Sequence, residues 1–157
     1  MLRVDVRELR NGPVDTIGEI QANDPLFEGF ELDLGSPLAV SGLLETTGRR
    51  GGYFWHGQFA GSAKRFCRRC LKEFVQLISG RAEVLFSPDP DLQDDPSVYP
   101  LVEPVSQVDV TEAVREELAL SVTAYPLCRE DCAGLCQRCG ADLNLGPCFC
   151  TTSTEPS

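Results

Sequence analysis

Apolar and polar residues alternate with a period of two through the middle of the chain, and this pattern predicts three long antiparallel strands. The first strand runs from Leu38 to about Thr46. The second begins at residue 53, and its apolar face carries Tyr53, Trp55, Gly57 and Phe59. The third spans about 74–86, and its apolar phase contains Phe74, Ile78, Ala82, Val84 and Phe86. Because aromatic and β-branched residues share one phase, we expect a sheet with one buried face.

Shorter alternating segments and turn motifs surround these strands. Residues 2–6 and 30–34 alternate apolar and charged side chains, as half-exposed strands do. The glycine-rich segment 47–52 predicts a hairpin loop between the first two long strands. Residues 87–107 hold five prolines and the acidic residues Asp89, Asp91, Asp94 and Asp95, which predicts a solvated loop or a strip that docks a basic partner.

A single helix is predicted from Asp109 to about Val122. Its apolar stripe, which we expect to pack on the sheet, consists of Val110, Val114, Leu118 and Val122. Asp109 and Glu112 have the spacing of a capping box, in which the side chains at the two positions satisfy free backbone N–H groups. The helix leads directly into a cysteine-rich segment.

Eight of the 157 residues are cysteines, and they are grouped: Cys67, Cys70, Cys128, Cys132, Cys136, Cys139, Cys148 and Cys150. The first residues of the chain mix charges into every turn and lack the apolar segment of a secretion signal. We therefore expect a cytoplasmic protein with reduced thiols, and grouped thiols in a reducing compartment usually bind metal.

The cysteine spacing indicates structural zinc. Residues 67–70 and 136–139 both read Cys-x-x-Cys, a spacing that places two sulfurs on one side of a tight turn. Four thiolates around zinc form the commonest closed structural site. One interpretation is two sites, the first with Cys67, Cys70, Cys128 and Cys132, the second with Cys136, Cys139, Cys148 and Cys150. The alternative is a single site with spare thiols.

These elements predict an α+β fold: a mostly antiparallel β-sheet with one packed helix and a C-terminal zinc-bound cysteine module. We expect a β-rich domain over residues 1–126, with its helix at 109–122. Residues 127–150 would form the zinc module packed on that domain. Residues 151–157 have no apolar anchor and are predicted to be a disordered tail.

Charge changes the choice of partners. The chain has 14 Lys and Arg against 24 Asp and Glu, a net charge of −10, which argues against non-specific coating of nucleic acid. This negative charge suits a basic partner such as a ribosomal protein. Alternatively, it only keeps the protein soluble. The local cations Lys64, Arg65, Arg68, Arg69 and Lys72 would offset the charge of a zinc–thiolate site. Alternatively they contact RNA phosphates, with Arg49 and Arg50 nearby if the hairpin folds over them.

Catalysis finds little support in the sequence. A catalytic zinc keeps an open position and usually has histidine or carboxylate ligands, whereas the single histidine, His56, lies in the middle of a predicted strand. The His-x-Glu and Pro-Cys-x-x-Cys motifs of zinc deaminases are missing. A thioredoxin-like pair belongs at a helix N-terminus, but Cys67 and Cys70 lie between strands. We expect no catalytic residues, and a thiol redox protein is the weaker alternative.

Residues 127–144, with Cys148-Phe149-Cys150, resemble the C-terminal signature of the YceD-like family. These are the large ribosomal RNA subunit accumulation proteins of bacteria and plastids. Residues 67–71 are similar to the family's other motif, and the resemblance spans roughly residues 30–150. It implies a non-enzymatic accessory factor in ribosome large-subunit biogenesis. Such a factor would act through a large-subunit ribosomal protein or assembly factor, with limited rRNA contact. The rival function is a zinc-based protein-interaction module in another pathway, such as transcription.

Overall fold

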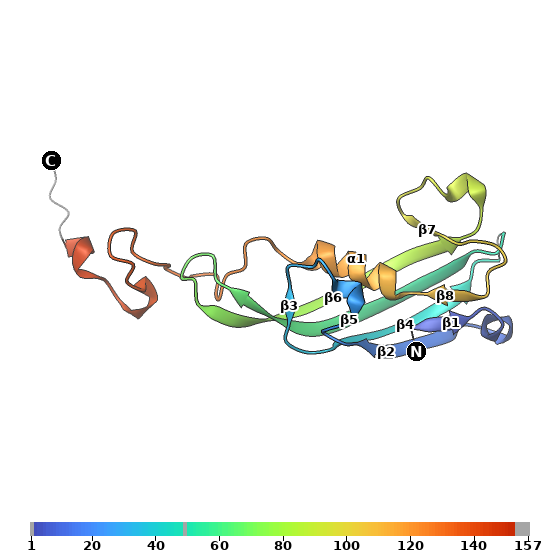
Figure 1. The fold of residues 1–157 in the computed structure, drawn as a ribbon, viewed down its shortest axis with the longest axis horizontal. Coiled ribbons are helices and arrows are strands. Elements are labelled where there is room, and N and C mark those ends of the chain that lie inside the picture. The colour runs from blue at the N-terminus through green and yellow to red at the C-terminus, as the bar shows by residue number, and fades with distance from the viewer. Residues whose placement is uncertain (1, 49, 153–157) are drawn as a thin grey trace.

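The computed structural model describes residues 2–48 and 50–152, which form an elongated molecule built on one long sheet (Figure 1). Its strands lie side by side in the order β2 (Val14–Ile20), β4 (Leu38–Thr46), β5 (Tyr53–Phe66), β6 (Glu73–Ser87) and β7 (Val98–Pro100). The short strand β3 (Asp33–Leu34) pairs with the C-terminal end of β5. All these pairings are antiparallel except β6 with β7, which is parallel.

Two further elements complete the fold. Strands β1 (Arg3–Asp5) and β8 (Gln107–Asp109) form a separate antiparallel pair. Helix α1 (Thr111–Ser121) follows β8 and packs against β6, with Ala113, Val114 and Leu118 buried. The prediction of a mostly antiparallel sheet with one helix is therefore confirmed. No helix in the described part of the chain is long and apolar enough to cross a membrane.

Strand β2 was missed by the sequence analysis, which predicted no strand between residues 6 and 30. Its inner phase carries the polar residue Thr16, which is fully buried and breaks the apolar alternation. The structure supplies the reason, because the indole Nε1 of the buried Trp55 donates a hydrogen bond of 2.8 Å to the hydroxyl of Thr16. A buried tryptophan N–H requires an acceptor, and Thr16 provides it from the neighbouring sheet edge.

Two glycines make room for the aromatic core. A Cβ atom on Gly57 would lie 2.2 Å from Cζ2 of Trp55, and one on Gly80 would lie 2.4 Å from Cζ of Phe59. Both rings are essentially inaccessible to solvent. The aromatic side chains thus occupy the space that side chains at positions 57 and 80 would take, which explains why a glycine stands in the apolar phase of β5.

The segment before the helix differs from the prediction. Residues 87–107 are not a plain loop, because they contain a 3-10 turn, η3 (Pro90–Leu92), and strand β7, whose Val98 is buried. The helix begins at Thr111, and the predicted capping box of Asp109 and Glu112 does not form. Asp109 belongs to β8, and its Oδ1 instead accepts hydrogen bonds from the N–H and the hydroxyl of Thr111, at 3.0 and 2.6 Å. Pairing of β8 with β1 holds Asp109 in extended backbone, outside the helix.

The short elements differ in part from the alternating pattern. Only residues 33 and 34 of the alternating segment 30–34 pair as a strand, whereas residues 2–6 contain β1 as predicted. The other short elements are 3-10 helices: η1 (Glu8–Asn11), η2 (Pro25–Phe27), η4 (Leu143–Leu145) and η5 (Phe149–Thr152). The predicted disordered tail begins inside η5, and its residues 153–157 lie outside the described residues.

Candidate metal centres

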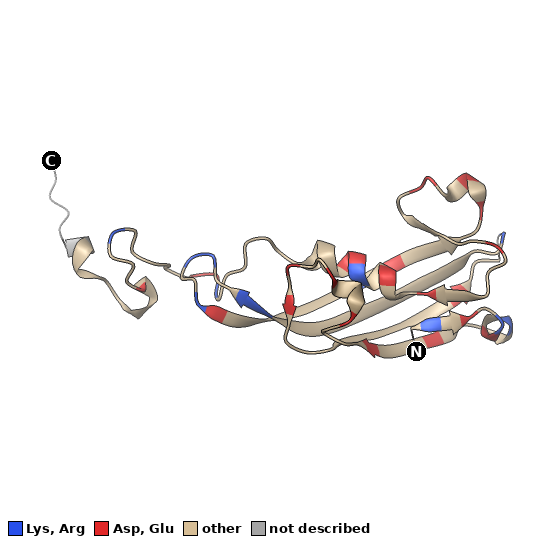
Figure 2. Cartoon of the chain, viewed as in Figure 1, with Lys and Arg blue, Asp and Glu red and all other residues tan. Residues whose placement is uncertain are grey.

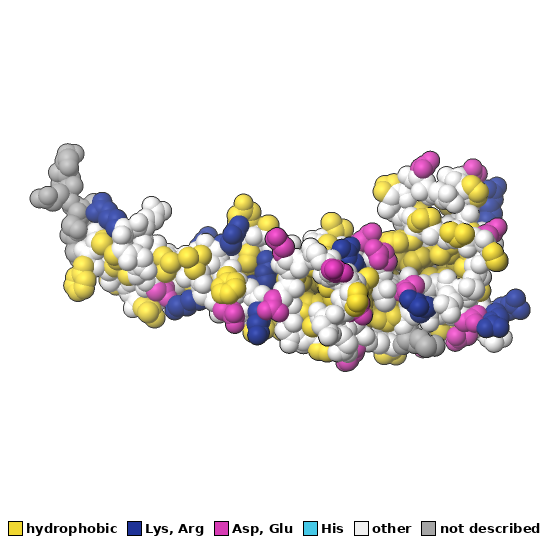
Figure 3. Space-filling model, in the orientation of Figure 1, with side chains coloured by type: hydrophobic (Ala, Val, Ile, Leu, Met, Phe, Trp, Pro, Cys, Tyr) yellow, Lys and Arg dark blue, Asp and Glu magenta, His cyan; other side chains and the backbone are white. Residues whose placement is uncertain are grey.

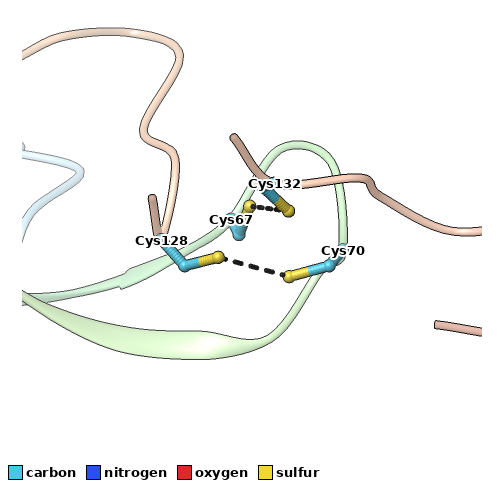
Figure 4. Close-up of side chains that lie close together, drawn as sticks. All are labelled: Cys67, Cys70, Cys128 and Cys132. Atoms are coloured by element: carbon cyan, nitrogen blue, oxygen red, sulfur yellow. Dashed lines mark hydrogen bonds between the residues drawn. The ribbon is translucent and has the colours of Figure 1, made fainter. Parts of the chain in front are cut away.

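The first cysteine tetrad joins the β5–β6 turn to the segment after α1. Cys67 and Cys70 come from the turn, and Cys128 and Cys132 come from the later segment, with all four sulfurs within 4.8 Å of one another. The Sγ atoms of Cys67 and Cys132 are 3.7 Å apart, as are those of Cys70 and Cys128 (Figure 4). A tetrahedron with zinc–sulfur bonds of about 2.3 Å separates its sulfurs by about 3.8 Å. These two sulfur–sulfur separations match those of a tetrahedral zinc site.

The second tetrad is closed locally by the C-terminal segment. Cys136, Cys139, Cys148 and Cys150 also have their sulfurs within 4.8 Å of one another. The structure thus brings the eight cysteines together in the two groups of the two-site interpretation, and all eight are free of disulfides. The two tetrads differ in exposure: three thiols of the first are buried, whereas those of the second are half-buried or exposed.

The two Cys-x-x-Cys turns have the same backbone geometry. In the first, the N–H of Cys67 donates to the carbonyl of Lys72 and the N–H of Leu71 donates to that of Cys67, both at 2.9 Å. In the second, Cys136 donates to Ala141 and Gly140 donates to Cys136, at 2.8 and 2.9 Å. The fifth residue has a positive φ in both turns, 62° for Leu71 and 72° for Gly140. Each turn consequently presents its two sulfurs to one point.

Thiol acidity differs sharply within each tetrad. Burial opposes ionisation of Cys67, but the backbone N–H groups of Cys70, Cys128 and Arg69 outweigh it and lower its pKa to about 6. The N–H groups of Cys139 and Arg138 lower the pKa of Cys136 to about 6. Desolvation and neighbouring thiols raise the pKa of Cys128 to about 12.

In the second tetrad, Cys150 contrasts with Cys136, because hydrogen bonding with Cys139 and then burial raise the pKa of Cys150 to about 12. Four thiolates packed this closely repel one another, so one thiol in each group ionises readily while another resists. A divalent cation at the centre removes the conflict, because it favours ionisation of all four ligands. The donor set and its electrostatics therefore suit a soft or borderline metal ion.

Asn144, which the sequence pattern missed, links the second cysteine segment to the first tetrad. Its Nδ2 donates to Sγ of Cys132 at 3.4 Å and to Oδ1 of Asp142 at 2.9 Å. Its Oδ1 accepts from the N–H of Ala133 at 2.8 Å and from Arg129 at 2.7 Å. The side chain of Asn144 is the first cause of the lowered pKa of Cys132. It therefore orients the thiol of Cys132 and favours its ionised form.

The basic residues of the turn hold the C-terminal segment in place. Arg65 donates to the carbonyl of Thr123 at 2.8 Å, and Arg69 donates to the carbonyl of Cys132 at 3.0 Å. The guanidinium of Arg68 lies 5.4 Å from the centroid of the Tyr125 ring. Lys72 forms an ion pair of 2.5 Å with Asp142. Neither interpretation of these cations from the sequence included this fastening role.

The expectation that the hairpin arginines join this cluster is wrong for Arg50. Arg50 lies at the opposite end of β5, where it pairs with Asp89 at 3.0 Å and with Asp91 at 3.4 Å. Arg49 lies outside the described residues. The acidic loop that holds Asp89 follows β6, and the β5–β6 turn with its Lys and Arg residues, the basic turn, precedes β6. The 15 residues of β6 therefore separate these two charged poles of the molecule by roughly 50 Å (Figure 2).

The single histidine lies away from the cysteines. His56 is exposed on the outer face of β5, between Leu43 of β4 and Glu83 of β6 in the pairing register. Its ring centroid is 6.0 Å from that of Phe54. Neither described cysteine group includes it, which leaves all-thiol ligand sets in both centres.

Comparison with known proteins gives the family. Residues 55–157 match the family model of "Large ribosomal RNA subunit accumulation protein YceD". Over 46 residues the chain is 35% identical to "Large ribosomal RNA subunit accumulation protein YCED homolog 1, chloroplastic" of Arabidopsis thaliana. That match covers 29% of this chain and 14% of the length of the relative. No solved structure gives a significant match. Since the family model covers well over half of the residues, the chain belongs to the YceD family.

Proposed function

We propose that this protein is a non-enzymatic accessory factor in ribosome large-subunit biogenesis that supports accumulation of large-subunit ribosomal RNA. Each cysteine tetrad would hold one structural zinc ion. The observation that carries the proposal is the pair of closed four-thiol centres beside a basic turn, in a chain whose family model is named for ribosomal RNA accumulation. We place the protein in the cytoplasm, while the relative's name assigns that protein to the chloroplast.

Zinc would act here as a crosslink. A four-thiolate site leaves no open coordination position, so it supplies folding energy rather than chemistry. In the first tetrad, Cys67 and Cys70 would hold the ion from the turn while Cys128 and Cys132 hold it from the segment after α1. Arg65, Arg69 and Lys72 fasten the same two segments by hydrogen bonds and an ion pair. The centre would thus keep the distal cysteine segment attached to the end of the sheet.

The partner we propose is a basic large-subunit ribosomal protein or an assembly factor. The loop offers it an acidic surface at one end of the sheet through the exposed Asp91, Asp94 and Asp95, while the largely buried Asp89 pairs with Arg50 (Figure 2). Limited rRNA contact would use the opposite end, where Lys64, Arg68 and Lys72 are exposed. Figure 3 shows Lys and Arg side chains on this part of the surface. Opposed charges steer such encounters, and both contacts should weaken as salt rises.

The first experiment measures metal and RNA together. Protein purified without chelators is analysed for metal, and cells lacking the gene are assayed for the ratio of large- to small-subunit ribosomal RNA. We expect close to two zinc ions per chain and a lowered ratio that the wild-type gene restores. Protein without zinc, or an unchanged RNA ratio, would refute the corresponding half of the proposal.

The second experiment separates the two poles. Replacing the four loop aspartates with lysine should abolish capture of the basic partner, whereas Lys64→Glu should spare it and weaken RNA contact. Lys64 suits this test because, in the described residues, no hydrogen bond or ion pair of its side chain is part of the fastening. Capture of transcription proteins instead of large-subunit precursors would favour the interaction-module rival.

A redox role has one supporting observation, the lowered pKa of the half-buried Cys136, because the thiolate is the form that reacts with oxidants; Cys67, whose pKa is also lowered, is fully buried. Thiol titration of the native protein distinguishes the two functions. Zinc-bound thiolates react slowly and release metal as they do so, whereas a redox pair reacts at once without metal release.

A further inference from the structure

Strand β6 has a long open edge. It pairs with β5 along its entire length, but on its other side it pairs with β7 only at residues 85–87. Between Glu73 and Val84, no strand of the described chain (residues 2–48 and 50–152) lies against this edge. Such an edge presents a row of unpaired N–H and C=O groups, which is a template for another strand.

The register shows which residues face outward along this edge. The carbonyl of Ser87 accepts a hydrogen bond of 2.9 Å from Leu101, on the β7 side. Backbone groups alternate between the two sides of a strand with a period of two, so the odd-numbered residues from 73 to 83 direct their N–H and C=O groups to the open edge. The side chains of the same residues lie on the outer face, where Val75 is 65% and Leu77 is 84% exposed.

We propose that β6 of one chain pairs with β6 of a second copy, antiparallel and centred on Leu77, so that two sheets become one. This register makes every hydrogen-bonded pair a pair of odd-numbered residues, which is the arrangement that the open edge provides. It sets Leu77 against its own copy, Val75 against Ser79, and Glu73 against Arg81. Glu73 and Arg81 are both exposed, and neither side chain has a hydrogen bond or ion pair among the described residues. The interface is isologous and self-complementary.

The same register brings together the two charged poles. Residues 85–87 of one chain, which immediately precede the acidic loop, come level with residues 67–69 of the other, inside the basic turn. The exposed aspartates at positions 91, 94 and 95 would then lie on the same side of the dimer as the partner copy's Arg68, across β7, which occupies the β6 edge at residues 85–87. This arrangement occurs twice in each dimer, so the dimer should weaken as salt rises.

Strand β2 forms the opposite edge of the sheet, and its charges would repel each other in a self-pairing. An antiparallel self-pairing of β2 centred on Ile17 would set Asp15 of one copy against Glu19 of the other, on the exposed face. Like charges directly opposite each other destabilise a strand pair. The charge pattern therefore favours self-pairing at β6 and opposes it at β2.

The test uses the zinc-loaded full chain and two charge reversals, Glu73→Arg and Arg81→Glu. Sedimentation velocity of the wild type, from low micromolar to several hundred micromolar, should show a monomer–dimer equilibrium that shifts to monomer at high salt. Each variant alone places like charges opposite each other twice, and its dimer should weaken on the order of tenfold. Mixed in equal amounts, the two variants should form a heterodimer. The two reversed side chains then face each other, and the unchanged Arg81 of one chain faces the unchanged Glu73 of the other.

Two exposed residues outside the sheet edge supply matched controls, Glu28→Arg and Arg10→Glu, which should dimerise as the wild type does. Circular dichroism and zinc content verify that every variant is folded. A wild type that stays monomeric throughout the range overturns the proposal. So does a dimer that both edge variants leave unchanged, or an equal mixture that fails to associate better than either variant alone. None of these outcomes bears on ribosomal RNA accumulation, so the proposed function stands or falls separately.

Discussion

Lys72 and Asp142 form an ion pair of 2.5 Å that joins the β5–β6 turn to the C-terminal cysteine segment. Lys72 follows the last cysteine of the first turn by two residues, and Asp142 follows the last cysteine of the second turn by three. The carboxylate is largely buried, with 10% of its side chain exposed. Hydrogen bonding to Lys72 lowers the pKa of Asp142, and Asp142 raises the pKa of Lys72 in return. The two cysteine turns are thus linked by side chains as well as by their proposed metal ions.

Replacing Asn144 with alanine should weaken metal binding at the first tetrad. The substitution removes the hydrogen bond to Sγ of Cys132 and the bonds that orient residues 129–133. Loss of a residue that orients a ligand typically costs about 10- to 100-fold in metal affinity. Cobalt titration followed by its thiolate charge-transfer bands, against a competing chelator, measures that affinity. Gln137→Ala, a change in the second turn, is the control and should bind as the wild type does. Equal affinities for all three proteins would contradict the proposed role of Asn144.

Replacing Cys136 with serine should unfold residues 134–150, which hold the second tetrad, and leave the sheet folded. A structural zinc contributes on the order of 10 kcal/mol to a small site, and the second tetrad would lose it. The apolar core around Trp55 is a separate cluster from the one around Cys67, Cys70 and Cys132. Tryptophan fluorescence should therefore keep its native maximum, while limited proteolysis cleaves after residue 133. A shift of the fluorescence maximum to that of the unfolded chain would show that the sheet depends on the module.

Replacing Gly80 with alanine should destabilise the sheet by overpacking. The new Cβ would lie 2.4 Å from Cζ of Phe59, a ring that is only 2% exposed and has little freedom to move. Overpacking of this kind costs about 1–3 kcal/mol in the free energy of unfolding. Urea unfolding followed by fluorescence measures it. Ser79→Ala, on the exposed face of the same strand, should change stability by less than about 0.5 kcal/mol. A Gly80→Ala variant as stable as the wild type would mean that the ring has room to shift.

Asp109→Asn should make stability less sensitive to acid. Burial opposes ionisation of Asp109, but hydrogen bonds from Thr111 and Arg3 outweigh it and lower its pKa below the ordinary value of 3.8. A carboxyl with a lowered folded-state pKa contributes stability that is complete above the ordinary value and is lost as pH falls through the folded value. The wild type should exceed the variant by about 1 kcal/mol at neutral pH, a figure that allows for the exposure of the side chain.

The difference in the free energy of unfolding between the wild type and Asp109→Asn should stay constant down to about pH 5 and shrink below about pH 4. Comparing the two proteins at each pH cancels the acid protonation of the cysteines, which both share. Arg3→Gln, which keeps the bonds from Thr111 to Asp109, should show a smaller loss of the same sign. A difference that grows on acidification would mean that the folded-state pKa of Asp109 is raised instead.

The long strands, the helix and the second cysteine tetrad were predictable because each rests on local spacing, whereas the first tetrad joins cysteines about 60 residues apart and the sequence left one site or two open. Alternation in residues 38–46, 53–59 and 74–86 reports one buried face of a sheet, and those segments are β4, β5 and β6. The Cys-x-x-Cys turns close through hydrogen bonds within six residues, so their geometry follows from the local chain. The match of residues 127–150 to a family signature added the functional expectation, and the family model confirmed the family.

Tertiary structure decided what depends on residues far apart in the chain. Thr16 can be buried in β2 because its hydroxyl accepts a hydrogen bond from Trp55, 39 positions later, and a lone polar residue gives no pattern that reveals this. Asn144 and Asp142 act on Cys132 and Lys72, and Arg65 and Arg69 bind carbonyls some 60 residues away. Charge and spacing show which side chains are available for such contacts. Their partners emerge only when the β5–β6 turn and the segment after α1 meet, because hydrogen bonds and ion pairs require an approach of a few ångströms that sequence distance does not encode.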